Sequence, residues 1–298
     1  MEERIQTPLA PAKKRRKSVV LVCFSIVIGI AILIGLGVGG NLAYLNLTYD
    51  LPIFVNGASM YPYLNADAQR YDGYSYSNYT FLSGNARDKD IIDYGYGKTM
   101  ERVQGEGGLK RYDTLVTYYP SDYEKDGLGN YLRGEDGKLV LTKSAAPKIK
   151  RVIGLPGETV TYRIVKAEEG ESEFANPIWG ETKVSKGGEE ETLRPLYNVA
   201  DYQIGTAKYA YPATSYQWAS SSSTFTLELK EKEYLVAGDN RGYSSDGIAQ
   251  RFAVSEEMIV GKVFLMVGKC QMTVSSSGNT ISPNYSYLFL PWTYRRIG

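Results

Sequence analysis

The chain has 298 residues, and its 34 lysine and arginine residues nearly balance its 33 aspartate and glutamate residues. This near-neutral charge gives no reason to expect nucleic acid as a partner. The sequence contains no histidine, which excludes a Ser-His-Asp triad, a Cys-His dyad and every histidine metal site. An activated nucleophile in this chain would therefore need Lys, Asp, Glu or Tyr as its base.

Residues 18–40 are predicted to cross a membrane as a signal-anchor. The run from Ser18 to Gly39 carries no charge, and at about 1.5 Å per residue it can span a hydrocarbon core roughly 30 Å thick. The basic run KKRRK at 13–17 precedes it, and basic flanks stay in the cytoplasm. Residues 1–17 are therefore predicted to form a cytoplasmic tail, with everything from about residue 41 outside.

A cleaved secretory signal is the alternative reading of the same segment. The apolar run is longer than a signal core of about 7–15 residues, and no clear Ala-x-Ala motif follows it. A retained anchor is therefore the preferred interpretation.

Short alternating apolar runs follow the anchor, separated by Gly, Asp, Asn and Pro, and they predict a mostly β domain. These runs are LPIFVNG, DTLVTYYP, GKLVLTK, IKRVIGL, ETVTYRIV, TFTLELK, KEYLVAG and GKVFLMVG.

Three other stretches do not follow this pattern. Residues 65–110 are rich in Tyr, Gly, Asp and Asn, which predicts a long surface loop, and the polar residues 166–223 predict an insertion carried on the β core. The apolar and aromatic run 285–292 is predicted to form either a core strand or an aromatic edge at the membrane interface.

The first candidate for chemistry is Ser59, in the stretch GASMYPYL at 57–64. A Gly-x-Ser sequence alone does not distinguish a turn serine from a nucleophile. A serine nucleophile needs a base, and lysine can serve only if its pKa of about 10.4 falls by roughly three units, which burial among apolar groups can cause.

Lys150, in IKRVIGLPGE, is the best candidate for such a base. Apolar residues surround it, and Gly154, Pro156 and Gly157 predict a tight turn after the strand. Lys150 and Arg151 are predicted to point to opposite faces, because strand side chains alternate. Arg151 cannot be the base, because a guanidinium does not deprotonate in proteins.

A third stretch, VAGDNRGYSSDG at 236–247, places charged and amide groups in a turn after an apolar strand. A plain turn explains it adequately. Alternatively, these groups order an active site from behind, and Ser244 donates a hydrogen bond that holds a neutral lysine amine in place.

Taken together, these stretches resemble the bacterial type I signal peptidases, membrane-bound serine proteases of peptidase family S26. The anchor and four blocks occur in the family's order: GASMYPYL, RYDTLVTYYP, KRVIGLPGE and GDNRGYSSD. In the first block Tyr63 replaces the family's usual Thr, in the second Tyr112 replaces a Gly, and in the third Glu158 replaces an Asp.

The resemblance implies a role for each matching position. Ser59 would attack the scissile carbonyl, and Lys150 would act as general base and then as acid toward the leaving amine. The backbone N–H of Ser59 would contribute to the oxyanion hole, while Gly57 stands where some members carry a second hydroxyl donor. The supporting residues implied are Ser244, Asp239, Arg241, Asp246 and Arg151.

The implied fold is the family's mostly β catalytic core with an inserted smaller β region, preceded by one transmembrane helix. On this reading residues 41–158, including the loop at 65–110, form the first part of the core. Residues 159–231 form the inserted region, and residues 232–298 complete the core.

The family cleaves after small residues in an Ala-x-Ala-like pattern, which requires shallow apolar pockets. Our candidates for the pocket walls are Val55, Met60, Leu64 and Ile149; ordinary core positions are the alternative for each. The strands before Ser59 and before Arg151 are predicted to pair with an extended substrate from either side.

The implied partners are preproteins that carry signal peptides and the lipid bilayer, at the outer face of the cytoplasmic membrane, with contact to the secretion translocon left open. No cofactor, metal or nucleic acid is implied, and activity is expected to rise with pH as Lys150 loses its proton. One departure is Ile248, at the usual position of an arginine, for which Arg251 is a candidate substitute.

Two alternatives stay open from the sequence. One is a peptidase with the same dyad that serves a narrow set of clients, such as pilin or surface proteins. The other is a catalytically silent, membrane-anchored β protein that binds exported chains.

Overall fold

The computed structural model describes most of the chain, with gaps. The described residues are 13–55, 59–60, 63–64, 91–166, 178–193, 211–212, 224–239, 244–275, 278–283 and 291–297. The chain divides into two compact units, residues 1–48 and residues 49–298, and each is described by itself.

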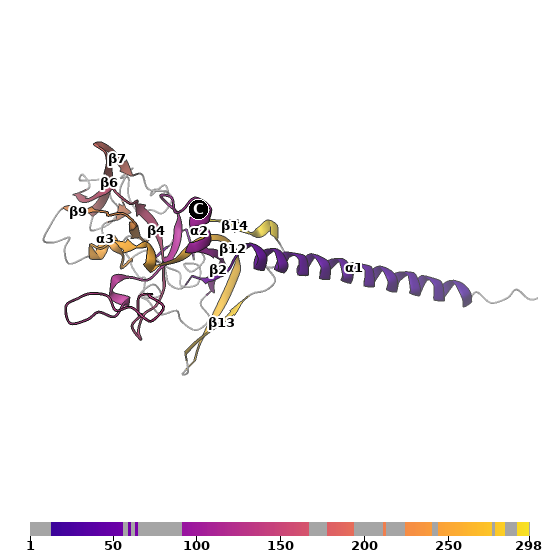
Figure 1. Cartoon of the computed structure of the whole chain (residues 1–298). Helices are drawn as coiled ribbons and strands as arrows, with labels where there is room; N and C mark the ends of the chain where they lie inside the picture. The colour runs from indigo at the N-terminus through magenta and orange to yellow at the C-terminus, as the bar shows by residue number, and fades with distance from the viewer. Residues whose placement is uncertain are drawn as a thin grey trace, which may run out of the picture. The chain divides into compact units, whose positions relative to one another are not determined.

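The first unit contains a single described element, the long helix α1 (Lys13–Thr48) (Figure 1). Its apolar part, Val19–Thr48, is the only helix among the described residues that is long and apolar enough to cross a membrane. Many of its residues are Val and Ile, which are weak helix formers in water, but in lipid a helix satisfies every backbone hydrogen bond internally. Most of its apolar side chains are exposed, Leu33 at 70% for example, although Leu45 near its end is buried. A cleaved signal would share these properties.

The second unit is built on a large antiparallel sheet. Within the described residues its strand order is β1-β2-β12-β3-β4-β10-β11, and β13 and β14 also pair with β12. The strands are β1 (Leu51–Phe54), β2 (Ile91–Thr99), β3 (Thr114–Thr117), β4 (Lys148–Gly154), β10 (Glu233–Ala237), β11 (Val254–Ser255), β12 (Ile259–Ser275), β13 (Gly278–Pro283) and β14 (Arg295–Arg296).

A second, smaller antiparallel sheet has the order β7-β6-β5-β9, with β8 paired to β6. Its strands are β5 (Thr159–Lys166), β6 (Ile178–Lys186), β7 (Glu189–Leu193), β8 (Tyr211–Pro212) and β9 (Thr224–Glu228). The predicted mostly β fold is therefore confirmed. The division of residues 41–298 into a two-part core and an inserted region stays a prediction, because both sheets share one hydrophobic cluster.

Short helices connect the strands. They are α2 (Met100–Gly105), α3 (Gly247–Gln250) and the 3₁₀ turns η3 (Pro120–Asp122), η7 (Glu256–Met258) and η9 (Pro291–Thr293). Helix α2 buries Met100 and Val103, one turn apart, on the same face. Of the predicted aromatic run 285–292, only Pro291 and Trp292 lie in the described residues, and Trp292 is 77% exposed in η9.

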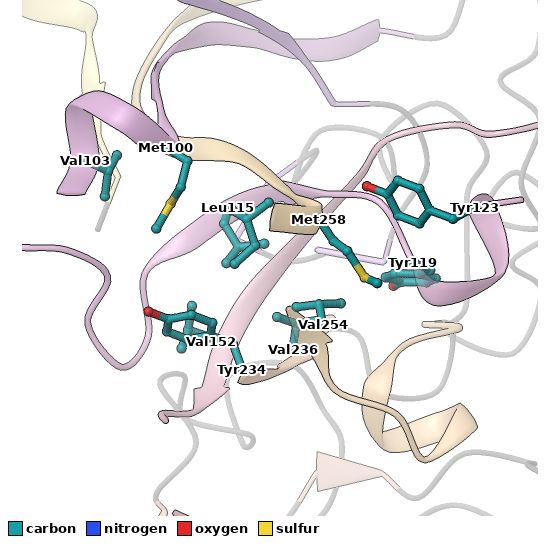
Figure 2. Close-up of a cluster of buried hydrophobic side chains, with 11 residues drawn as sticks. Met100, Val103, Leu115, Tyr119, Tyr123, Val152, Tyr234, Val236, Val254 and Met258 are labelled. Atoms are coloured by element: carbon teal, nitrogen blue, oxygen red, sulfur yellow. The ribbon is translucent and has the colours of Figure 1, made fainter. Parts of the chain in front are cut away.

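Two hydrophobic clusters hold the second unit together. The first joins α2 to strands β3, β4, β10 and β11, and Figure 2 shows its side chains converging on one volume. The second packs the small sheet, through Val160 and Tyr162, against Ile153 of β4 and Leu235 of β10. Strands β4 and β10 therefore have apolar side chains in both clusters, which fixes the part of the chain that carries Lys150.

A third cluster shows that the large sheet curls. Ile53 of β1, Val116 of β3 and Val263 of β12 belong to the same cluster, with Ile149 of β4 packed against it. Strand β1 is four strands from β4 along the sheet order, so their side chains can meet only if the sheet bends round on itself.

The predicted surface loop at 65–110 is wrong for its second half. Residues 91–99 form strand β2, which pairs with both β1 and β12, and residues 100–105 form α2. The glycines that suggested a loop lie where β2 and β12 approach each other closely. A Cβ on Gly95 would lie 2.0 Å from the carbonyl oxygen of Leu265, and a Cβ on Gly97 would lie 2.3 Å from the carbonyl oxygen of Lys262. Strand β12 is irregular opposite these positions, and glycine permits this close approach.

One predicted strand run does not form an extended strand. In GKLVLTK, only isolated bridges occur, Arg133 with Leu139 and Tyr123 with Leu141. The other seven runs contain the described strands β1, β3, β4, β5, β9, β10 and the first part of β12.

We expect Gly95→Ala to destabilise the second unit by more than about 2 kcal/mol, because the added methyl group would collide with backbone rather than with a movable side chain. The matched control is Gly105→Ala, since a Cβ there meets no atom within 4 Å and alanine is the better helix former. The measurement is urea unfolding in detergent; equal unfolding midpoints for the two variants would contradict this account of β2.

Candidate active site

Lys150 lies in the middle of β4, a strand flanked by β3 and β10. Leu115 of β3 is its partner in the register. Lys150 and Arg151 are exposed by only 3% and 2%. A lysine so deeply buried is unusual and needs a polar partner.

That partner is Ser59. Lys150 Nζ donates hydrogen bonds to Ser59 Oγ at 2.8 Å and to the backbone carbonyl of Ile149 at 2.8 Å. The two side chains come from positions 91 residues apart in sequence. The curl of the large sheet accounts for this proximity, because it brings the chain that follows β1 against β4.

Burial lowers the pKa of Lys150 to about 8. Asp246 acts in the opposite direction and raises the pKa, nearby Lys148 lowers it, and Asp239 raises it by a smaller amount. A pKa of about 8 leaves an appreciable neutral fraction near neutral pH, so the amine can accept a proton.

Arg151, on the opposite face of β4, forms a buried ion pair with Asp239. Its Nε and Nη2 each lie 2.7 Å from a carboxylate oxygen of Asp239, and its Nη1 donates to the carbonyl of Tyr112 at 2.6 Å. The pair is 3% and 1% exposed. Since β10 ends at Ala237, this bidentate contact fixes the turn after β10 to the strand of Lys150.

A comparison with known families identifies the family of the chain. The sequence model described as signal peptidase, peptidase S26, matches residues 26–267. The chain belongs to the S26 family of signal peptidases. The match spans α1 from Ile26, Ser59, β4 and the turn after β10, so the predicted resemblance is confirmed. A comparison with curated proteins gave no match.

Ile248 stands at the position where the resemblance implied an arginine, and the structure shows what surrounds it. Ile248 is 3% exposed and lies in the second hydrophobic cluster. Asp246 instead caps α3: it accepts from the amides of Ile248 at 3.1 Å and Ala249 at 3.0 Å, and from that of Gly238 at 2.8 Å. Backbone donors thus stabilise this carboxylate. Arg251 lies against the ring of Phe225.

Ser244 differs from its expected role. Its hydroxyl is buried, yet among the described residues it has no hydrogen-bond partner, so the predicted hydrogen bond to Lys150 is not present. The Ile149 carbonyl holds the amine instead. Arg241 lies outside the described residues, as does Gly57.

The four candidates for pocket walls all belong to the third cluster or pack against it. Val55, Met60 and Leu64 are at most 2% exposed, and only Ile149 is partly exposed. In this structure the first three are core side chains rather than open walls, so their contact with substrate stays a prediction.

Sequence reasoning missed two features of the site. A Cβ on Gly238 would lie 2.3 Å from Ser244 Oγ and 2.4 Å from the Ser59 carbonyl oxygen, so this glycine permits both serine-bearing segments to lie against the chain just after β10. Asp122 accepts from Lys148 Nζ at 2.6 Å, beside the dyad candidates. For the contact of Lys148, the sequence contains one signal: the two-residue spacing that places Lys148 and Lys150 on the same face of β4.

We expect Lys150→Met to stabilise the folded protein near pH 7 by roughly 3 kcal/mol, because it removes a buried amine whose pKa is lowered from 10.5 to about 8. Between pH 8 and about 10.5 the unfolded wild type binds more protons than the folded one, so wild-type stability rises with pH and the difference should shrink. Urea unfolding in detergent from pH 7 to 10.5 measures it. Lys138→Met, at a side chain 83% exposed, is the control, and a pH-independent difference for Lys150→Met would contradict the lowered pKa.

Proposed function

We propose that this chain is a serine endopeptidase that removes N-terminal signal peptides from exported preproteins, with Ser59 as nucleophile and Lys150 as general base. The observation that carries the proposal is the 2.8 Å contact between Ser59 Oγ and the amine of a buried lysine whose pKa is lowered to about 8. Such a pair has the reach and the proton affinity that nucleophilic catalysis needs.

The proposed reaction begins with neutral Lys150. Its Nζ takes the hydroxyl proton as Ser59 Oγ attacks the carbonyl carbon of the scissile peptide bond. The tetrahedral intermediate then collapses, the C–N bond breaks, and the protonated lysine gives its proton to the leaving amine. This leaves an ester between Ser59 and the signal peptide. A water, deprotonated by Lys150, hydrolyses that ester and regenerates the serine hydroxyl.

The surrounding groups support this sequence of steps. Because Ile149 O accepts one Lys150 hydrogen, the lone pair of the neutral amine can be directed at Ser59. The backbone N–H of Ser59 is our candidate oxyanion donor. Asp239 and Arg151 would hold the turn at 238–239 in place, and Asp246 would hold the same turn through the amide of Gly238. Arg241 stays a predicted supporting residue.

The substrate is proposed to bind as an added strand. Among the described strands, β1 pairs only with β2, and β10 pairs with β4 at Arg151 and beyond but not at 148–150. Within the described residues, β1 and the 148–150 part of β4 therefore each have one backbone edge beside the dyad that no strand pairs with. An extended peptide could pair with both, which would place its small residues before the cleavage site near Ile149.

The membrane topology completes the proposal. The basic residues 13–17 would keep the N-terminus in the cytoplasm, so that the second unit acts at the outer face on preproteins as they emerge. This arrangement fits a general signal peptidase as well as one dedicated to a few clients, and substrate choice distinguishes them. A silent binding protein would not need a lysine buried against a serine.

The test is cleavage in detergent of a preprotein with an Ala-x-Ala site by wild type, Ser59→Ala and Lys150→Met. We expect the wild type to cut after the second Ala, and each variant to lose at least about a thousandfold in rate, because the two groups act as a unit.

Ser121→Ala and Lys138→Met, at exposed positions, are the matched controls and should cut normally. Full activity in both dyad variants would refute the assignment of Ser59 and Lys150. A wild type that cuts its own pilin or surface preproteins but not the general substrate would favour the dedicated peptidase.

A further inference from the structure

Tyr63, four residues after Ser59, is contacted by two guanidinium groups. The guanidinium carbon of Arg151 lies 4.5 Å from the centre of its ring, and that of Arg295 lies 5.2 Å away. Arg295 also donates through Nη1 to the backbone carbonyl of Tyr63 at 2.7 Å. Tyr63 replaces the threonine usual in the family, and only an aromatic ring offers a face to cations.

Arg295 belongs to a C-terminal segment that lies beyond the part of the chain matched to the S26 family, residues 26–267. This segment is fixed to the large sheet. Strand β14 pairs with β12, the amide of Ile297 donates to the carbonyl of Phe264 at 2.8 Å, and Ile297 is buried in the same cluster as Met60 and Leu64. These contacts fix the backbone around Arg295 to the large sheet.

A second contact fixes the direction of the Arg295 side chain. Its Nη2 lies 3.2 Å from a carboxylate oxygen of Asp93, a buried residue of β2, and Lys269 lies 3.6 Å from the other oxygen. Arginine suits this position because two different nitrogens of its planar fork reach the Asp93 carboxylate and the Tyr63 carbonyl while the guanidinium carbon lies over the Tyr63 ring.

The turn that begins at Met60 connects these contacts to the candidate nucleophile. The amide of Leu64 donates to the carbonyl of Met60 at 2.9 Å, and Met60 directly follows Ser59. Arg295 holds the far end of this turn from one side, and Arg151, next to Lys150, contacts the same tyrosine. The turn is therefore tied both to the C-terminal segment and to the strand of the general base.

We propose that Arg295 and Tyr63 are positioning residues for Ser59. Through these two residues the C-terminal segment holds the turn at 60–64 in place, and this keeps the Ser59 hydroxyl within reach of Lys150. The inference rests on the proposed function. It assigns a positioning role to Arg295, which lies outside the family's matched region, and it gives a reason for tyrosine at position 63.

Arg295→Gln is the first test variant, and Arg296→Gln is its matched control. Residue 296 neighbours it on β14 and is also exposed, and its side chain has no hydrogen bond or ion pair within the described part of the chain. Arg295→Gln should fold, because Asp93 keeps Lys269 as a partner. We expect kcat to fall about tenfold with KM nearly unchanged, since small misplacements of reacting groups cost rate. Arg296→Gln should behave as wild type.

Variants at the tyrosine separate the ring from the hydroxyl. Tyr63→Phe keeps the ring and should stay within about twofold of wild type, whereas Tyr63→Thr should lose as much kcat as Arg295→Gln. Arg295→Lys should recover only part of the loss.

Hydrogen exchange of the peptide covering residues 59–64 gives a readout independent of activity. It should be faster in Arg295→Gln than in Arg296→Gln, because the turn closed by the Leu64 amide loses its support.

The outcomes separate this proposal from the proposed function. If Ser59→Ala abolishes cleavage but Arg295→Gln matches Arg296→Gln in kcat and in exchange, the positioning role is wrong and the dyad stands. A change confined to KM would also overturn it, since that would indicate a substrate contact. If Ser59→Ala still cleaves, both proposals fall.

Discussion

The burial of one amine against one hydroxyl imposes the main constraint on this structure. Lys150 is tolerated inside the protein because Ser59 and the Ile149 carbonyl satisfy its nitrogen, and its lowered pKa means that part of the population is neutral near neutral pH. The strands next to Lys150 keep its amine buried. Strand β4 lies between β3 and β10, and Lys150 itself is only 3% exposed. Burial of this kind disfavours the charged form of the amine.

The charged groups around Lys150 do not cancel the lowering of its pKa. Arg151 faces away from the lysine and forms a bidentate ion pair with Asp239. The carboxylate of Asp246 accepts hydrogen bonds from three backbone amides. A carboxylate stabilised in this way still raises the pKa of Lys150, but less than a direct ion pair would. This capping arrangement explains how the site accommodates Ile248 at the position where the resemblance implied an arginine.

Much of this was predictable from sequence, because strand alternation and short motifs are local signals. The runs around β4 and β10, and the S26 family membership, were found in that way. Strand β2 was missed because Gly95 and Gly97 were interpreted as loop residues, although they allow close strand approach. The burial of Val55 and the isolation of the Ser244 hydroxyl depend on how distant segments pack. No local pattern encodes that packing, and the same holds for the contact between Tyr63 and Arg295.

The central claim is that neutral Lys150 activates Ser59, and the most direct test is the pH dependence of kcat/KM for cleavage of an Ala-x-Ala preprotein. Since the lysine must be deprotonated to accept the hydroxyl proton, the account predicts a rise of about tenfold per pH unit below the pKa of Lys150, which is about 8, and a plateau above it. A rate that does not change between about pH 6 and 9 would contradict lysine as the base.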